Sequence, residues 1–391
     1  KSGEKPRDRR FHSAQWQDDP YYRSVRDAYL LASQQLRDLV AVGDGEGSAK
    51  AMSRFLLDQY LNAVSPANFA ATNPDVMKRV QETGGANLVN GFKNLVEDFT
   101  SGKGIVQRRT DASAFVKGET IAATPGEVVF QNHLFQLIQY TPTTAKVAEA
   151  PLLYVPPLVN RYYMIDLAPD QSLVKWLVGE GRTVFVVSWV NPGPEHKDQG
   201  VEDYVVDGVV AAIDEVRRRT KAAPDLFAFC LGGTLVAIAL AWLAAEGRGK
   251  AVNSATLIGS LVDFADMRDW SAFVHEGHLD ALDDHLEKAG YIDSLELQRL
   301  FAAMRANDLI WSSVVQHYLL DKPAPASDLL TWFEDGARIP AAFLKSYNRD
   351  LLLNNKLAEP AGFAVRGTPI DLAKIEARTI EIRPGTVDPE H

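Results

Sequence analysis

A single cysteine, Cys230, lies between an apolar run that ends at Phe229 and the glycine pair Gly232-Gly233. The run at residues 225–229 has the composition of a buried strand, and residues 235–245 form a second apolar run with helical character. A strand, a tight turn with one reactive side chain and a helix are the parts of a nucleophile elbow. Cys230 is therefore the candidate nucleophile. The alternative is a buried core thiol, the commonest fate of a free cysteine.

The choice of cysteine in this turn indicates the kind of substrate. The general pattern of such elbows is G-x-S-x-G, because backbone and helix approach closely on both sides of the nucleophile. Ala228 and Gly232 occupy the two small positions, and Cys230 replaces the serine. A thiolate exchanges readily with a thioester because the bond broken and the bond formed are alike, and some thiolate is present at neutral pH. The turn therefore predicts acyl transfer from a thioester.

Such a reaction needs backbone N–H donors for the negative charge that develops on the carbonyl oxygen. The elbow geometry assigns one donor to the N–H of Leu231, directly after the nucleophile. The second donor is expected from residues 156–163 (PPLVNRYY), with Val159 or Asn160 as the better candidates. The same loop is also consistent with a rigid connector whose aromatic side chains pack in the core.

Uncharged runs separated by helical patterns predict the sheet that must carry this turn. Buried strands that alternate with helices indicate a parallel sheet covered on both faces, hence an α/β protein. The alternation stops near Leu261, and residues 262–365 are interpreted as a cap inserted over the carboxyl-terminal edge of the sheet. The predicted strands are 152–155, 183–188, 225–229, 254–259 and 379–382, preceded by a hairpin of 127–130 and 134–140.

Helical patterns fill the part of the chain before the sheet. Apolar residues recur at helical spacing in residues 21–40, 52–63 and 88–99. Asn73-Pro74 has the form of a helix N-cap followed by proline at the first helical position. This first region is predicted to be all-helical and contains no cluster of catalytic residue types.

Composition limits the functional classes. The 391 residues carry a formal net charge of −10, which argues against nucleic acid as the main partner. One cysteine excludes an intrachain disulfide and fits a reducing cytoplasm. Residues 226–245 lack charge over the length of a membrane span, but the glycine pair in their middle favours a strand followed by a helix. The first residues are polar and contain no apolar signal core.

With these motifs in order, residues 11–380 resemble the polyhydroxyalkanoate (poly-3-hydroxybutyrate) synthases, the PhaC family, and within it the single-subunit class I type. The resemblance implies an α/β-hydrolase fold with a nucleophile elbow, an inserted cap and a helical N-terminal domain. It divides the chain into residues 1–115, 116–261, 262–365 and 366–391. The motifs that carry it are SPANFAATNP (65–74), FQLIQY (135–140), PPLVNRYY (156–163), VVSW with NP (186–192), FCLGGT (229–234), LVDF (261–264), EGH (276–278) and NDLIW (307–311).

The resemblance also implies an activity. Such an enzyme is an acyltransferase that polymerises (R)-3-hydroxyacyl-CoA, here expected to be 3-hydroxybutyryl-CoA, releases CoA and carries the acyl chain as a thioester on Cys230. Expected partners are this substrate, the growing polyester, a second copy in a homodimer and granule-associated proteins, with no nucleic acid and no transmembrane span. No cofactor or metal is expected, and the location is the cytoplasm, at the surface of polyester granules.

The chain departs from the family pattern at its C-terminal part. The family uses a Cys-His-Asp arrangement whose aspartate and histidine follow the last two strands of the core. Asp388 lies near the expected aspartate but its neighbours do not match, and His391 comes too early for the histidine. The tail is interpreted as a truncation or a frameshift. The remaining histidines are interpreted as surface or packing residues: His12, His133, His196, His275, His278, His285 and His317. The spacing of His275, His278 and His285 could suit a metal site, but a solvated face of the cap is the preferred interpretation.

Two alternatives remain open from the sequence. One is an α/β-hydrolase thioesterase or esterase, in which water rather than the polymer hydroxyl takes the acyl group. The other is a catalytically inactive fragment, associated with granules or forming dimers, because the histidine that should activate Cys230 is missing. The loss of a positioned general base typically costs about 10²–10⁴-fold in rate.

Overall fold

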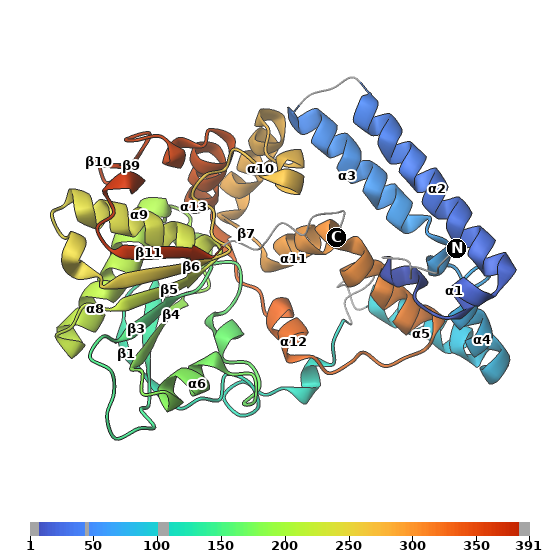
Figure 1. Cartoon of the computed structure of the whole chain (residues 1–391), viewed down its shortest axis with the longest axis horizontal. Helices are drawn as coiled ribbons and strands as arrows, with labels where there is room; N and C mark the ends of the chain where they lie inside the picture. Colours follow the sequence, from blue (N-terminus) through green and yellow to red (C-terminus); the bar gives the residue numbers. More distant parts are fainter. Residues whose placement is uncertain (1–7, 44–46, 101–108, 383–391) are drawn as a thin grey trace. The chain divides into compact units, whose positions relative to one another are not determined.

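The computed structural model describes residues 8–43, 47–100 and 109–382, and they form two compact units (Figure 1). One unit contains the chain up to Ala114 together with Arg268–Phe273 and Gln298–Leu330. The other contains Phe115–Met267, Val274–Leu297 and the chain from Thr331 onward. Both units take segments from the predicted cap, residues 262–365. The division of the chain at 115, 261 and 365 stays a prediction.

The second unit is built on a seven-stranded sheet with the order β1-β2-β4-β3-β5-β6-β11. The antiparallel pairs β1–β2 and β2–β4 form one side, and the pairs from β4 through β3, β5 and β6 to β11 are parallel. The predicted hairpin and the predicted parallel strands are thus confirmed. The strands are β1 (Gly126–Gln131), β2 (Phe135–Tyr140), β3 (Leu152–Val155), β4 (Val184–Trp189), β5 (Asp225–Phe229), β6 (Ser254–Ile258) and β11 (Arg378–Ile382).

Helices cover both faces of this sheet because parallel strands require crossover connections. Helix α6 (Leu173–Gly179) packs on one face, where Val174 and Val178 join a core cluster with Tyr154 of β3. Helix α9 (Leu231–Ala245) packs against β3, β5 and the π-helix η6 (Tyr204–Val210), which runs on into α8 (Ala211–Thr220) (Figure 1). A small hairpin of β9 (Phe363–Val365) and β10 (Thr368–Ile370) also contacts α9.

The packing around α9 explains why residues 226–245 contain no charge. They form β5, the turn at Cys230 and α9, and α9 is buried along nearly its whole length because it has neighbours on several sides. Within the described ranges, no helix is both long and apolar enough to cross a membrane.

The remaining elements of the second unit come from the predicted cap region. Helix α10 (Glu276–Ala289) packs against α13 (Ala341–Ser346), and the π-helix η11 (Tyr347–Leu353) follows α13 directly. Two short strands, β7 (Tyr291–Ile292) and β8 (Ile339–Pro340), pair antiparallel. Helix α12 (Asp328–Glu334) precedes β8, and its first three residues, up to Leu330, belong to the first unit. Helix α11 (Ser294–Met304) is divided between the two units.

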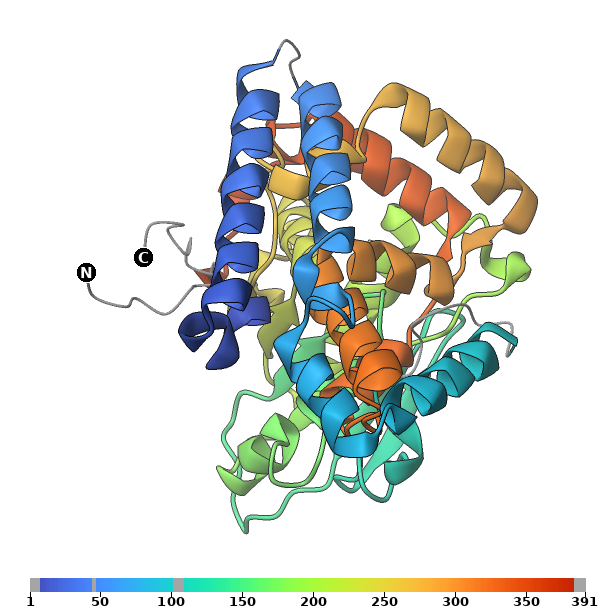
Figure 2. The same ribbon diagram turned by 90° about the vertical axis from the view of Figure 1, so that its right-hand side faces the viewer.

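The first unit is helical, as predicted. Helices α2 (Pro20–Val42) and α3 (Gly47–Ala63) lie side by side, as Figures 1 and 2 show. They are followed by α4 (Pro74–Thr83) and α5 (Ala86–Thr100), and α1 (Gln15–Asp18) precedes them. The predicted cap at Asn73 is confirmed, because its Oδ1 accepts hydrogen bonds from the N–H groups of Asp75 at 2.9 Å and Val76 at 3.3 Å.

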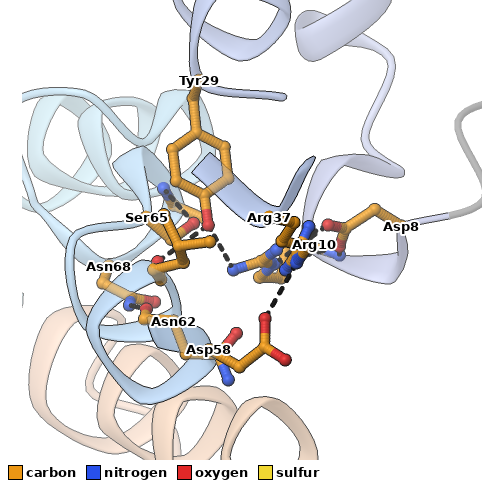
Figure 3. Close-up of polar contacts among 10 residues, drawn as sticks. Asp8, Arg10, Tyr29, Arg37, Asp58, Asn62, Ser65 and Asn68 are labelled. Atoms are coloured by element: carbon orange, nitrogen blue, oxygen red, sulfur yellow. Dashed lines mark hydrogen bonds and ion pairs between the residues drawn. The ribbon is translucent and has the colours of Figure 1, made fainter. Parts of the chain in front are cut away.

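The motif at residues 65–74 has a structural role in this unit (Figure 3). Asn68 Nδ2 donates to the carbonyl oxygen of Asn62 at 2.7 Å, and Asn73 Nδ2 donates to that of Ala67 at 2.6 Å. Close by, the Tyr29 hydroxyl donates to the carbonyl oxygen of Leu61 at 2.7 Å and accepts from Arg10 Nη1 at 3.1 Å. The polar side chains of this motif therefore fix the chain between α3 and α4.

Helix α5 buries a face that its sequence pattern does not indicate. Its apolar stripe is exposed: Phe92 and Phe99 are 64% and 68% accessible. Gly91 instead lies against the backbone of Tyr318 in η10 (Val314–Leu319), where a Cβ would overlap the Tyr318 carbonyl group. Asn87 Nδ2 donates to the Leu319 carbonyl oxygen at 2.7 Å. Close backbone approach at a glycine, together with polar bonds, decides which face is buried.

Candidate active site

The turn after β5 has the geometry of a nucleophile elbow. Cys230 has φ 52° and ψ −127°, a conformation that non-glycine residues adopt only under strain. Its N–H donates to the carbonyl oxygen of Ile258 on β6 at 2.9 Å, and α9 begins at the next residue. The predicted strand, turn and helix are therefore confirmed, with Cys230 at the point where the chain reverses.

The two glycines after the cysteine are required by close packing. A Cβ at Gly232 would overlap the carbonyl oxygen of Val155 and lie 2.8 Å from the carbonyl carbon of Pro156. A Cβ at Gly233 would overlap the Ser260 hydroxyl and lie 2.6 Å from the Ser260 Cβ. The first turn of α9 is thus packed against the end of β3 and the chain after β6. Ala228, in the first small position of the elbow pattern, is fully buried.

The thiol of Cys230 is reachable from solvent but is not activated by any described base. The residue is exposed, yet the protein around the sulfur desolvates the thiolate and raises the pKa of Cys230. The backbone N–H of Leu231 hydrogen-bonds the sulfur and lowers the pKa by a smaller amount. Among the residues that the structure describes, no histidine or cation contributes to this pKa. The thiol is held mainly in its neutral form at neutral pH.

Two tyrosines that the sequence analysis did not single out lie near the thiol. Burial, and then the nearby Cys230 thiolate, raise the pKa of both Tyr154 and Tyr347. Tyr154 is fully buried on β3, and its hydroxyl has no hydrogen-bond partner within the described ranges. Tyr347 begins η11 and packs edge-on against Phe264. No local sequence signal could have found this pair, because it depends on how η11 and β3 approach the elbow.

The chain between β3 and η4 (Tyr162–Ile165), residues 156–161, is here named the proline loop. Pro156 and Pro157 have no N–H, so the first possible donors after β3 are Leu158 and Val159. The carbonyl oxygen of Val159 accepts from the N–H of Ala337 at 2.8 Å, and Asn160 Nδ2 donates to the carbonyl oxygen of Phe333 at 3.3 Å. The Asn160 side-chain amide therefore bonds the last turn of α12. The roles of Leu231 and Val159 as oxyanion donors stay predictions.

The other candidate residues within the described ranges do not contribute to the pKa of Cys230. Asp388 and His391 lie outside the described residues. His275 and His278 stack with ring centroids 4.7 Å apart, whereas His285 lies 3.4 Å from Glu296. Within the described ranges, no group of three or more His, Cys, Asp or Glu side chains is arranged to hold a metal ion.

The four other histidines do not contribute to the pKa of Cys230 either. His196 Nδ1 accepts from the N–H of Gly193 at 3.2 Å. His317, which is 9% accessible, lies with Nδ1 3.1 Å from the carbonyl oxygen of Lys322. His133 and His12 have no resolved influence on Cys230.

A mostly parallel sheet whose strand β5 leads through a strained cysteine turn into a buried helix defines an α/β-hydrolase-fold protein with a cysteine elbow. Residues 7–177 match the family described as "Poly-beta-hydroxybutyrate polymerase (PhaC) N-terminus". The chain is 41% identical to the poly(3-hydroxyalkanoate) polymerase of Methylorubrum extorquens and 39% identical to the polymerase subunit PhaC of Cupriavidus necator. The chain belongs to this PhaC family.

These matches cover most of this chain but less of its relatives. Each covers 95% of this chain, and they cover 62% and 64% of the two polymerases. Poly(3-hydroxyalkanoate) polymerase 2 of Ectopseudomonas oleovorans is 38% identical over 95% of this chain and 66% of its own length. Among solved structures, the monoacylglycerol lipase of Paleococcus ferrophilus is 15% identical over 64% of this chain and 88% of its own, with a TM-score of 0.34, which is too low to support a conclusion.

Proposed function

We propose that the chain acts in an acyltransferase that polymerises (R)-3-hydroxyacyl-CoA into polyhydroxyalkanoate, with 3-hydroxybutyryl-CoA as the expected substrate. The observation that carries this proposal is the position of Cys230, exposed on a strained turn at the N-terminus of α9. The names of the relatives support the same reaction class. The chain spans about two thirds or less of these relatives, so the activity of the complete protein is part of the proposal.

The proposed first step is a thioester exchange at Cys230. The thiolate attacks the carbonyl carbon of the acyl-CoA, a bond forms between Sγ and this carbon, and the bond to the CoA sulfur breaks. CoA leaves as a thiolate and takes up the proton that Cys230 released. The N–H of Leu231 and a second N–H from the proline loop would stabilise the oxyanion of the intermediate. The hydroxyl of a second monomer or of the growing polyester then attacks the acyl group and frees Cys230.

The environment of the thiol limits the rate expected from the described part of the chain. Its pKa is raised by desolvation, and no described histidine is in a position to remove its proton. We therefore expect slow CoA release where Cys230 depends on the described residues alone. The proposal includes action in the cytoplasm at polyester granules, a homodimer and contacts with granule-associated proteins, each of which follows from the family.

The test is to supply (R)-3-hydroxybutyryl-CoA and to follow free CoA, acylated Cys230 and products by mass spectrometry. Acylated Cys230 and polyester are expected from the complete gene product, with the Cys230→Ala variant as the inactive control. Release of monomeric 3-hydroxybutyrate without polymer would instead establish a thioesterase. No acylation of Cys230 under any condition would refute the proposed function. Rapid acylation of Cys230 in a variant that keeps only the described residues would refute the expected slow release.

A further inference from the structure

The proline loop is held in place by a segment that is distant in the sequence. Residues 331–337, which are the end of α12 and the chain leading to β8, are here named the clamp segment. Trp332 Nε1 donates to the carbonyl oxygen of Arg161 at 2.8 Å, and the N–H of Ala337 donates to that of Val159 at 2.8 Å. Asn160 pairs with Gly336 in an isolated antiparallel bridge. The clamp segment thus bonds the backbone of the loop at several successive residues.

One carboxylate connects this segment to the chain on both sides of the loop. Asp335 Oδ2 accepts hydrogen bonds from the Tyr163 hydroxyl at 2.7 Å and from Lys117 Nζ at 2.6 Å. Arg161 Nε lies 3.6 Å from Asp335 Oδ1. Tyr163 is itself 2% accessible and belongs to a core cluster with Ile121. Asp335 therefore links the clamp segment to the proline loop through Arg161 and to the core through Tyr163.

The charge state of Asp335 agrees with this geometry. Burial alone would raise the pKa of Asp335, but hydrogen bonds from Lys117 and Tyr163 and the charges of Lys117 and Arg161 together lower it. Because its pKa is lowered, the carboxylate is ionised at neutral pH, and its side chain is only 22% accessible. A charged acceptor makes stronger hydrogen bonds than a neutral one, roughly twofold in general. An isosteric amide at this position would keep the shape and lose the charge.

The loop that Asp335 holds is in direct contact with the elbow. It begins at Pro156, whose carbonyl group would be met by a Cβ at Gly232 in the first turn of α9. Leu158 and Val159, the first residues of the loop with an N–H, follow directly. Small displacements of a positioned group are costly, because a shift of about 1 Å can reduce a rate about 10²-fold. A change at Asp335 would thus be transmitted through Arg161 and Tyr163 to the proline loop, from which the second oxyanion donor is expected.

We infer that Asp335 is a positioning residue for acyl transfer at Cys230: it anchors the proline loop so that the N–H groups of this loop remain directed at the reacting carbonyl oxygen. The inference rests on the proposed function, since it concerns the acylation step of that reaction. In this scheme the clamp segment positions the oxyanion donor of the proline loop, while the other donor is the N–H of Leu231. Asp335 does not touch the substrate in this scheme.

The single cysteine allows the inference to be tested without turnover. S-phenyl thioacetate acylates Cys230 through a tetrahedral oxyanion, whereas iodoacetamide alkylates it without one. The ratio of the two rates, measured by mass spectrometry of the full chain, reports the oxyanion site separately from the thiol pKa. We expect Asp335→Asn to lower this ratio about tenfold relative to the unchanged chain. Hydrogen exchange at residues 158–163 should become faster in the same variant.

Asp350→Asn is the matched control. Asp350 also accepts from a lysine, Lys356, at 2.6 Å and from a hydroxyl, Ser346 Oγ, at 2.9 Å, and its side chain is 30% accessible, but these contacts do not include the proline loop. The ratio of the thioacetate rate to the iodoacetamide rate in Asp350→Asn should equal the ratio in the unchanged chain. If Asp335→Asn does not fold, Tyr163→Phe takes its place, because it removes one donor to the same carboxylate. The ratio of the two rates should then decrease by less than about tenfold.

Equal ratios in the unchanged chain, the Asp335 or Tyr163 variant and the control would overturn the role of Asp335. Failure of the proposed function has a different result, namely no acylation of Cys230 by (R)-3-hydroxybutyryl-CoA in the complete protein. The two failures are therefore distinguishable, since the thioacetate and iodoacetamide rates do not depend on which acyl-CoA the protein uses.

Discussion

The indole Nε1 of Trp189, at the end of β4, donates a 2.9 Å hydrogen bond to the carbonyl oxygen of Pro156, the first residue of the proline loop. The Trp189 ring also lies against Gly208 of η6, where a Cβ would come within 2.9 Å of it, and edge-on to Tyr204. The loop is thus fixed from the sheet side by Trp189 and from the other side by the clamp segment.

Replacement of Trp189 by phenylalanine should destabilise the protein. The change leaves the Pro156 carbonyl oxygen without its donor and opens space beside Gly208, and we expect a loss of about 2–4 kcal/mol in the free energy of unfolding. Urea denaturation measures this value. Trp176→Phe is the control, since Trp176 is 58% accessible and should change stability little. Equal losses in both variants would contradict the role of the Pro156 bond.

Replacement of Gly232 by alanine should disrupt the elbow. The new Cβ would overlap the Val155 carbonyl oxygen, which belongs to the sheet backbone and cannot move away cheaply, so a loss of about 2–3 kcal/mol is expected. Gly179→Ala is matched to it: Gly179 ends α6, and a Cβ there meets no atom within 4 Å. That control should be neutral or slightly stabilising. A fully stable Gly232→Ala variant would show that β3 and α9 are less closely packed than described.

The reactivity of Cys230 should depend on pH in a direction set by its raised pKa. Only the thiolate reacts with iodoacetamide, so the midpoint of the rate profile should lie at higher pH for the folded chain than for the chain unfolded in urea. The raised pKa of Cys230 also makes the free energy of unfolding decrease as the pH rises. Since the folded state holds this proton more tightly, the group's contribution to stability is present below the unfolded pKa and is lost as the pH rises through the folded pKa. A folded midpoint below the unfolded one would contradict the desolvated environment.

Replacement of Tyr154 by phenylalanine should not destabilise the protein. Its hydroxyl is buried and has no partner within the described ranges, so its removal is expected to be neutral or to stabilise by up to about 1 kcal/mol. Tyr163→Phe removes a hydroxyl that does have a partner, Asp335, and should cost about 1–2 kcal/mol. Comparison of the two unfolding free energies decides the matter: a loss at Tyr154 as large as that at Tyr163 would mean that the Tyr154 hydroxyl is bonded.

The local patterns predicted the elements well and their buried faces less well. Strand runs, the elbow and the Asn73 cap could be predicted because each depends on neighbouring residues and on backbone preferences. The apolar stripe of α5 is exposed, because Gly91 and Asn87 provide the close contact with η10 instead. Amphipathic spacing predicts a helix, but a glycine that permits close backbone approach can decide which side is covered.

The sequence by itself determined the position of the nucleophile and the α/β order, because a unique cysteine between a strand pattern and a glycine pair is a local signal. Only the tertiary structure decided what surrounds Cys230 and what holds the proline loop. Tyr163 and Asp335 are 172 positions apart, and Tyr154 and Tyr347 reach the thiol from β3 and η11. Such contacts depend on how residues distant in the sequence, such as those of η11 and the clamp segment, approach β3 and the proline loop, which no periodicity within one element encodes.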